Sequence, residues 1–140
     1  MNTNEINRVF RNDSRFIGTF CADNLTASPK KKYSFIFNTD PCSKSGSHWV
    51  ACYINNGTAE YFDSFGMPPL NHTFFEFLEK EKLNLCYSPV ILQHPLSIHC
   101  GLFCIRFLQA RMKGIAYSQF ISVFSRDSIE NDLILYTYNP

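Results

Sequence analysis

A short turn signal between two apolar runs is the feature that most restricts the fold of this chain. Asn55-Asn56-Gly57 separates a run at residues 48–54 from a second run at residues 58–65. Asn and Gly tolerate the positive φ angles that tight turns require, so such a signal between two strand-like runs favours a β-hairpin. We therefore expect two antiparallel strands joined at this turn.

The hairpin brings one pair of polar side chains together in either of two registers. If Asn55-Asn56 forms a two-residue loop, His48 lies directly opposite Asp63. If Asn56-Gly57 forms the loop, His48 opposes Phe65, and Asp63 becomes its diagonal neighbour. Side chains alternate between the faces of a strand, so both registers put His48 and Asp63 on one face, with Cβ atoms within about 5 to 8 Å. A carboxylate beside an imidazole fixes the ring tautomer and stabilises the imidazolium.

The rest of the chain mixes helix-like and strand-like patterns. This mixture predicts an α+β fold in a single domain of residues 1–140, with a small central mixed β-sheet flanked by helices. Strands are expected near residues 33–38 and 85–92, the second with an interruption near Ser88-Pro89. Residues 16–20 fit a strand or a loop, and residues 129–136 fit a helix or a strand equally well. Helices are expected from Asn2 or Thr3 to about Arg11, from Thr73 (with capping-box spacing to Glu76) to about Lys82, over Gly101–Met112 and over Tyr117–Phe124.

Composition excludes several classes of protein. Hydrophobic residues make up 45% of the chain and charged residues 18%, which suits a packed core and argues against disorder. The net charge of +1 gives no strong signature for DNA or membrane binding. The first residues lack an apolar signal-peptide segment, and no apolar run reaches the roughly 18 residues of a membrane helix. We therefore expect a soluble intracellular protein, in which most of the six cysteines are reduced.

Cys100 stands immediately before the predicted helix 101–112. A thiol at a helix N-terminus has a lowered pKa because the positive end of the helix favours the thiolate, and a nearby imidazolium lowers the pKa further. Gly101 leaves room beside the sulfur for a substrate carbonyl. The backbone N–H of Cys100 can donate to an oxyanion, and the side-chain amide of Gln93 is the best candidate for a second donor.

Each of these residues alone also has a plainer interpretation. A histidine at a strand end, an aspartate before a turn or a cysteine in a helix is common without any catalytic role. A zinc module is a further alternative, because imidazoles and thiolates are zinc ligands and four lie close together in the sequence: His94, His99, Cys100 and Cys104. That site leaves His48 and Asp63 unexplained, so we expect no metal. An inactive protein that kept the fold is the third alternative.

Several segments together resemble one family. These are residues 16–20 (FIGTF), 46–51 (GSHWVA), 61–66 (YFDSFG), Gln93 and 100–104 (CGLFC). On these segments, which span about residues 1 to 110, the chain resembles adenain, the adenovirus-type cysteine endopeptidase, and its shorter relatives in other DNA viruses and virus-like mobile elements. The resemblance implies a papain-like cysteine protease fold with rearranged chain order and the nucleophile at a helix N-terminus.

The resemblance also implies the catalytic roles. His48 is the general base that pairs with Cys100, Asp63 orients His48 in place of the family's Glu, and Gln93 supplies the oxyanion hole. Gln93 precedes Cys100 by seven residues, as in adenain. The related SUMO-specific proteases usually have six residues there and an Asp directly before the Cys, where this chain has His99.

By matched position, four residues are expected to line the substrate groove: Gly18, Thr19, Gly46 and Trp49. The adenovirus enzyme is activated by a viral peptide that can form a disulfide with it, and Cys86 lies in the analogous region. Two interpretations of Cys86 stay open, a partner for such a peptide or a thiol in a core strand.

The resemblance further implies an endopeptidase that cleaves virion precursor proteins, located in the virion and the host nucleus and acting as a monomer. Its chemistry needs no cofactor. The near-neutral charge makes activation by DNA doubtful, since the adenovirus enzymes are basic. A peptidase that removes SUMO-like or ubiquitin-like modifiers is the alternative function, because it uses the same triad.

Overall fold

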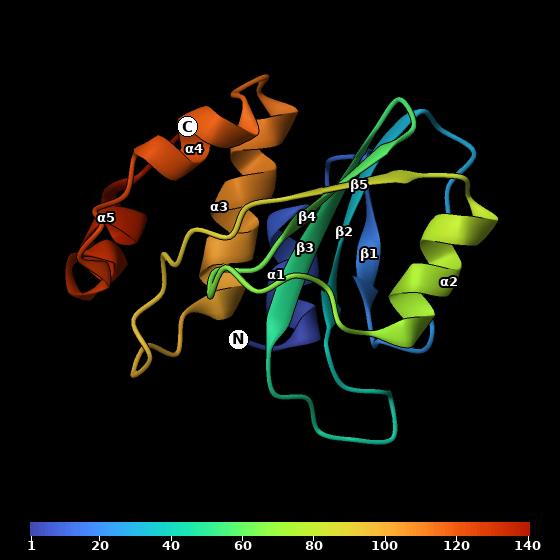
Figure 1. The fold of residues 1–140 in the computed structure, drawn as a ribbon, viewed down its shortest axis with the longest axis horizontal. Helices are drawn as coiled ribbons and strands as arrows, with labels where there is room; N and C mark the ends of the chain where they lie inside the picture. Colours follow the sequence, from blue (N-terminus) through green and yellow to red (C-terminus); the bar gives the residue numbers. More distant parts are fainter.

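The computed structural model describes residues 1–140 as an α+β fold around one mixed sheet (Figure 1). The five strands lie side by side in chain order: β1 (Phe16–Phe20), β2 (Lys32–Asn38), β3 (Trp49–Asn55), β4 (Thr58–Phe62) and β5 (Asn84–Tyr87). The pairs β2–β3 and β3–β4 are antiparallel, whereas the two edge strands run parallel to their neighbours. The expected small mixed sheet is therefore confirmed.

The helices occupy the segments between and after the strands. Asn2 caps the first helix: its side chain accepts from the N–H of Glu5, whose carboxylate accepts from the Asn2 N–H, forming a capping box. Residues 129–136, which fitted a helix or a strand, fall in a short 3₁₀ turn and a helix. The elements are α1 (Thr3–Val9), α2 (His72–Lys80), α3 (Cys100–Met112), α4 (Tyr117–Ser122), η1 (Ser128–Glu130) and α5 (Asn131–Thr137).

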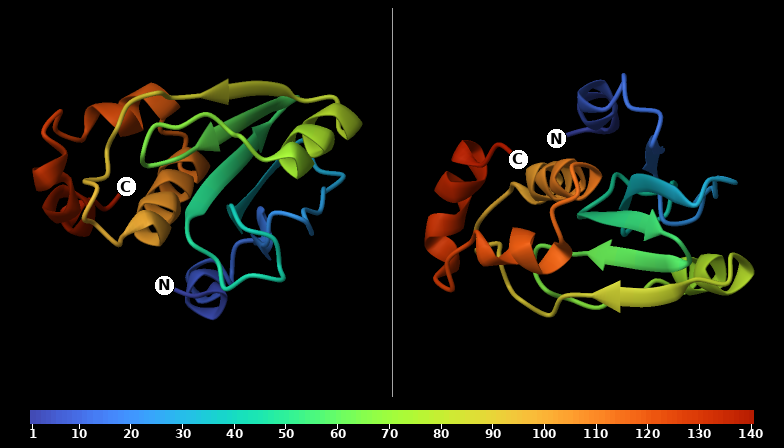
Figure 2. Two further views of the ribbon diagram at one scale, coloured as in Figure 1. Left: turned by 60° about the horizontal axis from the view of Figure 1, so that its bottom comes forward. Right: turned by 90° about the horizontal axis from the view of Figure 1, so that it is seen from above.

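The two faces of the sheet carry separate apolar clusters, because side chains alternate along the central strands. Phe35 and Phe37 face α2, whereas Ile36 of the same strand faces the other way, toward α3. The views from two further directions show α2 near one end of the sheet and α3, with α4 and α5 beside it, on the opposite side (Figure 2). On the α3 side, the rings of Phe62 and Phe107 stack with centroids 4.7 Å apart.

The hairpin has the second of the two expected registers. Asn56 and Gly57 form the loop with φ angles of 47° and 90°, and Asn55 pairs with Thr58. The register with the loop at Asn55-Asn56 is therefore wrong. The regular ladder is shorter than expected, since it ends at the pair Ala51–Phe62. His48 and Asp63 consequently lie just beyond the ends of the two strands.

Two expectations about local structure need correction. The N-cap of α2 is Asn71, whose side chain accepts from the N–H of Thr73, so Thr73 lies inside the first turn instead of capping it. Strand β5 ends at Tyr87, where the interruption at Ser88-Pro89 was expected, because proline supplies no backbone donor. The strand does not resume, so its expected continuation to residue 92 is wrong.

Four of the six cysteines are free, but Cys21 and Cys42 form a disulfide with Cα atoms 5.0 Å apart. The bond joins the loop after β1 to the loop before β3, and these two loops come together because the N–H of Cys42 donates to Asp23 at 2.8 Å. None of the helices has the length and apolar composition needed to cross a membrane.

A buried ion pair fastens α3 to the sheet. Arg111 near the end of α3 donates two hydrogen bonds to the carboxylate of Glu60 on β4, at 2.6 and 2.9 Å. Both side chains are nearly buried, with 12% and 10% exposed, and the guanidinium also lies over the ring of Tyr53 at 4.8 Å. Since the helix begins at Cys100, this pair helps to fix Cys100 against the strands.

Removing one partner of the Arg111–Glu60 pair should lower the stability of the fold. Glu60→Ala leaves the Arg111 guanidinium buried without its counter-ion, and we expect the free energy of unfolding to fall by about 3 kcal/mol. Urea denaturation measures the change. Glu76→Ala is the matched control, because Glu76 is 67% exposed in its pair with His72, and it should cost less than about 0.5 kcal/mol. Equal effects of the two substitutions would contradict this role of Glu60.

Candidate active site

The open end of the hairpin holds a hydrogen-bonded pair, His48 and Asp63. Nε2 of His48 lies 2.8 Å from Oδ1 of Asp63, and the same oxygen accepts the backbone N–H of Phe65 at 2.8 Å. The Asp63 side chain is only 7% exposed. The ring of Phe65 lies 5.1 Å from the imidazole, as the hairpin register places it across from His48. The carboxylate therefore holds one ring nitrogen of His48 and leaves Nδ1 for another partner.

Cys100, the first residue of α3, is the second titratable group that interacts with this imidazole. Burial disfavours the imidazolium, but the hydrogen bond to Asp63 and the interaction with Cys100 outweigh it and raise the pKa of His48 to about 9. Burial likewise disfavours the thiolate, yet the His48 imidazolium and hydrogen bonds from the backbone of Trp49 and Gly101 lower the pKa of Cys100. The opposite shifts favour a thiolate–imidazolium pair near neutral pH.

Gly101 has a reason to be glycine that the sequence did not indicate. A Cβ at this position would lie 3.2 Å from atoms of the Met1 side chain and 3.3 Å from the Trp49 ring. Met1 is held there because its carbonyl accepts the indole N–H of Trp49 at 3.0 Å. The protein itself thus occupies the side of Gly101 on which a Cβ would lie, while another side of Gly101 lines the cavity in front of Cys100.

Gln93 is buried, and both the oxygen and the nitrogen of its side-chain amide form hydrogen bonds. Its Oε1 accepts the hydroxyl of Ser64 at 2.5 Å, and its Nε2 donates to the carbonyl of Ser97 at 2.9 Å. One amide N–H is thereby used, and the second has no protein acceptor. Sequence analysis did not single out Ser64 or Ser97. Ser64 directly follows Asp63 in the YFDSFG segment, and this position is the only feature of the sequence that could have indicated a role for it.

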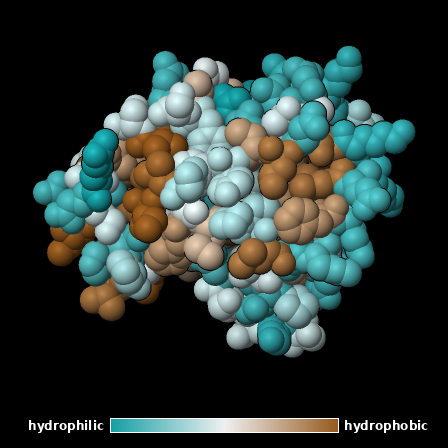
Figure 3. Space-filling model, viewed as in Figure 1, coloured by the Kyte–Doolittle hydropathy of each residue, from teal (hydrophilic) through white to brown (hydrophobic).

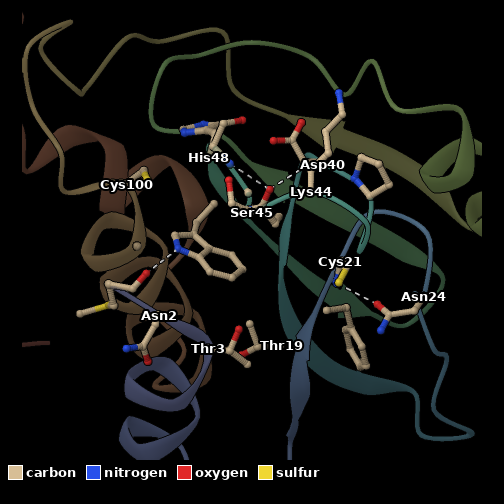
Figure 4. Close-up of a pocket in the computed structure, with 18 of the residues that line it drawn as sticks. Asn2, Thr3, Thr19, Cys21, Asn24, Asp40, Lys44, Ser45, His48 and Cys100 are labelled. Carbon is tan, nitrogen blue, oxygen red and sulfur yellow. Dashed lines mark hydrogen bonds between the residues drawn. The ribbon is translucent and has the colours of Figure 1, made fainter.

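A cavity of about 630 Å³ opens in front of His48 and Cys100 (Figure 4). Three of the four residues expected in the groove line it, namely Thr19, Gly46 and Trp49. The fourth, Gly18, lies in a different hollow, beside Asn7 and Arg11. Successive residues of a strand face opposite sides, so Gly18 and Thr19 of β1 do not open onto the same space.

Gly46 shapes the loop that leads to His48. Its φ angle of +87° favours glycine, and a Cβ there would lie 2.5 Å from the side-chain nitrogen of Asn38. The Asn38 side chain accepts from the N–H of Asp40 and of Ser47, which fixes both ends of the loop. A larger residue at Gly46 would displace this asparagine and with it the approach to His48.

Cys86 lies on the edge strand β5 and is exposed, so its interpretation as a core thiol is wrong. It lines a separate hollow with Tyr87, Val90 and Tyr117. Partial burial and the nearby Glu60 carboxylate raise the pKa of its thiol. Cys86 is therefore accessible but less reactive than Cys100.

The side chains of the alternative zinc cluster do not converge. Cys104 is fully buried and its thiol donates to the carbonyl of Trp49, while His99 packs edge-on against Tyr136. Potential metal ligands meet elsewhere, at Cys21, Asp23 and Cys42, within 4.8 Å of one another. There the two sulfurs are bonded to each other, and only reduction would free them as ligands.

The chain has the fold of a cysteine protease, as two solved structures show. A crystal structure of the African swine fever virus (ASFV) pS273R protease superimposes with a TM-score of 0.65 at 17% identity, covering 98% of this chain and 65% of that one. The Se-Met crystal structure of the same protease gives a TM-score of 0.56 at 23% identity, covering 81% and 46%. No model of a known protein family matches the chain.

Sequence comparison finds the same viral protease among the relatives of this chain. The chain is similar to the "SUMO-1 cysteine protease S273R" of African swine fever virus, with 26% identity over 106 residues. The "Cysteine protease S273R" of the Badajoz strain gives the same values. Each alignment covers 67% of this chain and 39% of the relative, so the chain spans about two fifths of the length of these relatives. The relatives and the solved structures are cysteine proteases, the enzyme class that the sequence of this chain predicts.

The site predicts selective alkylation of one cysteine. At pH 6 to 7, iodoacetamide should modify Cys100 first, because its lowered pKa provides thiolate where an ordinary thiol, with a pKa of about 8.5, does not. Exposed Cys86 is the internal control, since its pKa is raised. Peptide mass spectrometry across pH 5 to 9 gives the alkylation rates of Cys100 and Cys86.

The same experiment on His48→Ala tests the cause of the selectivity. Without the imidazolium, the rate of Cys100 alkylation at pH 6 should fall toward the rate of Cys86 alkylation. In the wild type, the ratio of the Cys100 to the Cys86 alkylation rate should decrease as His48 loses its proton near pH 9. Cys100 labelling that is slow at pH 6, or unchanged by His48→Ala, would contradict the ion pair.

Proposed function

We propose that this chain is a cysteine endopeptidase of the adenain type, with a His48–Asp63–Cys100 triad and Gln93 in the oxyanion hole. The observation that carries the proposal is the linked set of three side chains, in which Asp63 holds one nitrogen of His48 and Cys100 interacts with the same ring. The pKa of the base is raised and that of the nucleophile is lowered, as thiol catalysis requires.

The reaction follows from this arrangement. The Cys100 thiolate attacks the carbonyl carbon of the scissile peptide, and the carbonyl π electrons move to oxygen. The backbone N–H of Cys100 and the free amide N–H of Gln93 stabilise this oxyanion. When the C–N bond breaks, His48 gives its proton to the leaving amine, leaving a thioester. Neutral His48 then removes a proton from water, which attacks the thioester and releases the acid and the thiolate.

The chain order His48, Asp63, Gln93, Cys100 and the seven-residue spacing from Gln93 to Cys100 support an adenain-type rearranged papain fold. The proposed substrates are viral capsid or core precursor proteins, cleaved in the virion or host nucleus by a monomer that needs no cofactor for its chemistry. Exposed apolar side chains near the site suit an extended polypeptide. Leu96 and Ile98 are 85% and 82% exposed, and hydrophobic surface is visible over the loop between β5 and α3 (Figure 3).

A second candidate function is the removal of SUMO-like modifiers. The name of one relative, "SUMO-1 cysteine protease S273R", favours this function. The spacing before Cys100 and His99 in place of an Asp favour the endopeptidase instead.

An activating peptide belongs to the proposal as well. Cys86 is free, exposed and on the edge strand β5, where a peptide thiol can reach it. A peptide crosslink that persists in Cys86→Ala would remove this role. Activation by DNA is not part of the proposal, given the net charge of +1.

A substrate panel distinguishes the two functions. Unstructured peptides from viral precursors, many containing glycine, are compared with SUMO-like and ubiquitin-like C-terminal tails, and cleavage is read by mass spectrometry. We expect cleavage within the precursor peptides, none by Cys100→Ala, and a loss of about 10²- to 10³-fold in kcat for Gln93→Ala. Hydrolysis of modifier tails alone would favour the second function. No hydrolysis of either class, with Cys100 readily alkylated, would contradict both.

A further inference from the structure

Helix α5 is fastened to the segment that carries Gln93 and leads into Cys100. The side chain of Asn131, fully buried at the start of α5, donates to the carbonyl of Leu92 at 2.9 Å. Leu92 directly precedes Gln93. The next residue of α5, Asp132, contacts the other end of the segment, just before Cys100. Residues distant in the sequence thus hold both ends of one loop.

Asp132 acts on this loop through Ser97. Its Oδ1 accepts the hydroxyl of Ser97 at 2.8 Å, and its Oδ2 lies 3.9 Å from Nε2 of His99. The hydroxyl of Ser97 also accepts the backbone N–H of His99 at 3.2 Å. Ser97 is therefore held by its side chain at one fixed place between α5 and the start of α3.

The backbone carbonyl of the same serine is the acceptor for Gln93. The Gln93 amide is fixed by this carbonyl on one side and by the Ser64 hydroxyl on the other. A planar amide held at both its oxygen and its nitrogen has one orientation, so its second N–H points in one direction. An oxyanion hole works because its donors are oriented before the charge develops.

We propose that Asp132 is a positioning residue for the oxyanion hole, which it orients through Ser97 and the Gln93 amide. This inference rests on the proposed function, because it gives the Gln93 amide the role of oxyanion donor. The contact between Asp132 and His99 is partly exposed, with 35% and 28% of the side chains accessible. Such pairs add little to stability. The consequence of losing Asp132 lies in the geometry of Gln93, not in the fold.

Two reactions of the same thiol separate positioning from nucleophile activation. Peptide hydrolysis passes through an oxyanion, whereas alkylation by iodoacetamide displaces iodide and forms none. Asp132→Ala should lower kcat about tenfold, less than the 10²- to 10³-fold for loss of a donor itself, with KM nearly unchanged. The rate of Cys100 alkylation and its pH profile should stay at the wild-type values.

Two variants serve as controls. Asp132→Asn keeps an oxygen that can accept the Ser97 hydroxyl, so it should retain most of the wild-type kcat. Leu133→Ala changes a neighbouring residue of α5 that is 71% exposed and should have no effect. An Asp132→Ala variant with wild-type kcat would overturn the inference. Parallel losses of kcat, alkylation rate and thermal stability would also overturn it, since they indicate a merely structural role.

A direct readout of Gln93 separates this inference from the proposed function. The side-chain amide protons of Gln93, assigned by their loss in Gln93→Ala, are followed by hydrogen exchange in NMR spectra. We expect slower exchange in the wild type and Leu133→Ala than in Asp132→Ala. Equal exchange in all three overturns the inference whether or not the protein cleaves peptides. A wild type that cleaves no substrate while the exchange differs removes the proposed function and the oxyanion role of Gln93, and leaves only the orientation of the Gln93 amide by Asp132.

Discussion

The hydrogen bond between His48 and Asp63 is the interaction on which the rest of the site depends. It exists because the hairpin turns at Asn56-Gly57, which sets the register that brings the two side chains together beyond the ends of β3 and β4. The carboxylate keeps the imidazole charged despite burial. The charged imidazole stabilises the Cys100 sulfur as a thiolate, so the turn sequence and the reactivity of the thiol are physically connected.

The nucleophile reaches this pair through tertiary packing. Helix α3 lies on one face of the sheet, where Phe107 stacks on Phe62 and Arg111 is bonded to Glu60. Apolar contact sets the distance of the helix from the strands, and the ion pair fixes its position along them. The surroundings of Gln93 are built differently, as a series of polar contacts from Ser64 through Gln93 to Ser97 and on to Asp132 of α5.

The sequence predicted what local rules determine. The alternation of side chains along a strand and the turn residues were sufficient to predict the hairpin and the proximity of His48 and Asp63. The spacing of apolar residues after Cys100 was sufficient to predict the start of α3. Contacts between distant segments were not predictable, because no local pattern encodes them. The Cys21–Cys42 disulfide and the bond from Ser97 to Asp132 depend on how distant segments meet in three dimensions. The position of Gly18 outside the main cavity follows instead from the alternation of side chains along β1, which the comparison of motifs did not take into account.

The most direct test of this account is the titration of His48 itself. NMR of the protein with labelled histidine, assigned by comparison with His48→Ala, gives the pKa of each imidazole. The account predicts a pKa of about 9 for His48, falling toward the ordinary value of about 6.5 in Asp63→Asn. A wild-type value near 6.5, or one that Asp63→Asn leaves unchanged, would contradict the claim that this hydrogen bond charges the imidazole and activates Cys100.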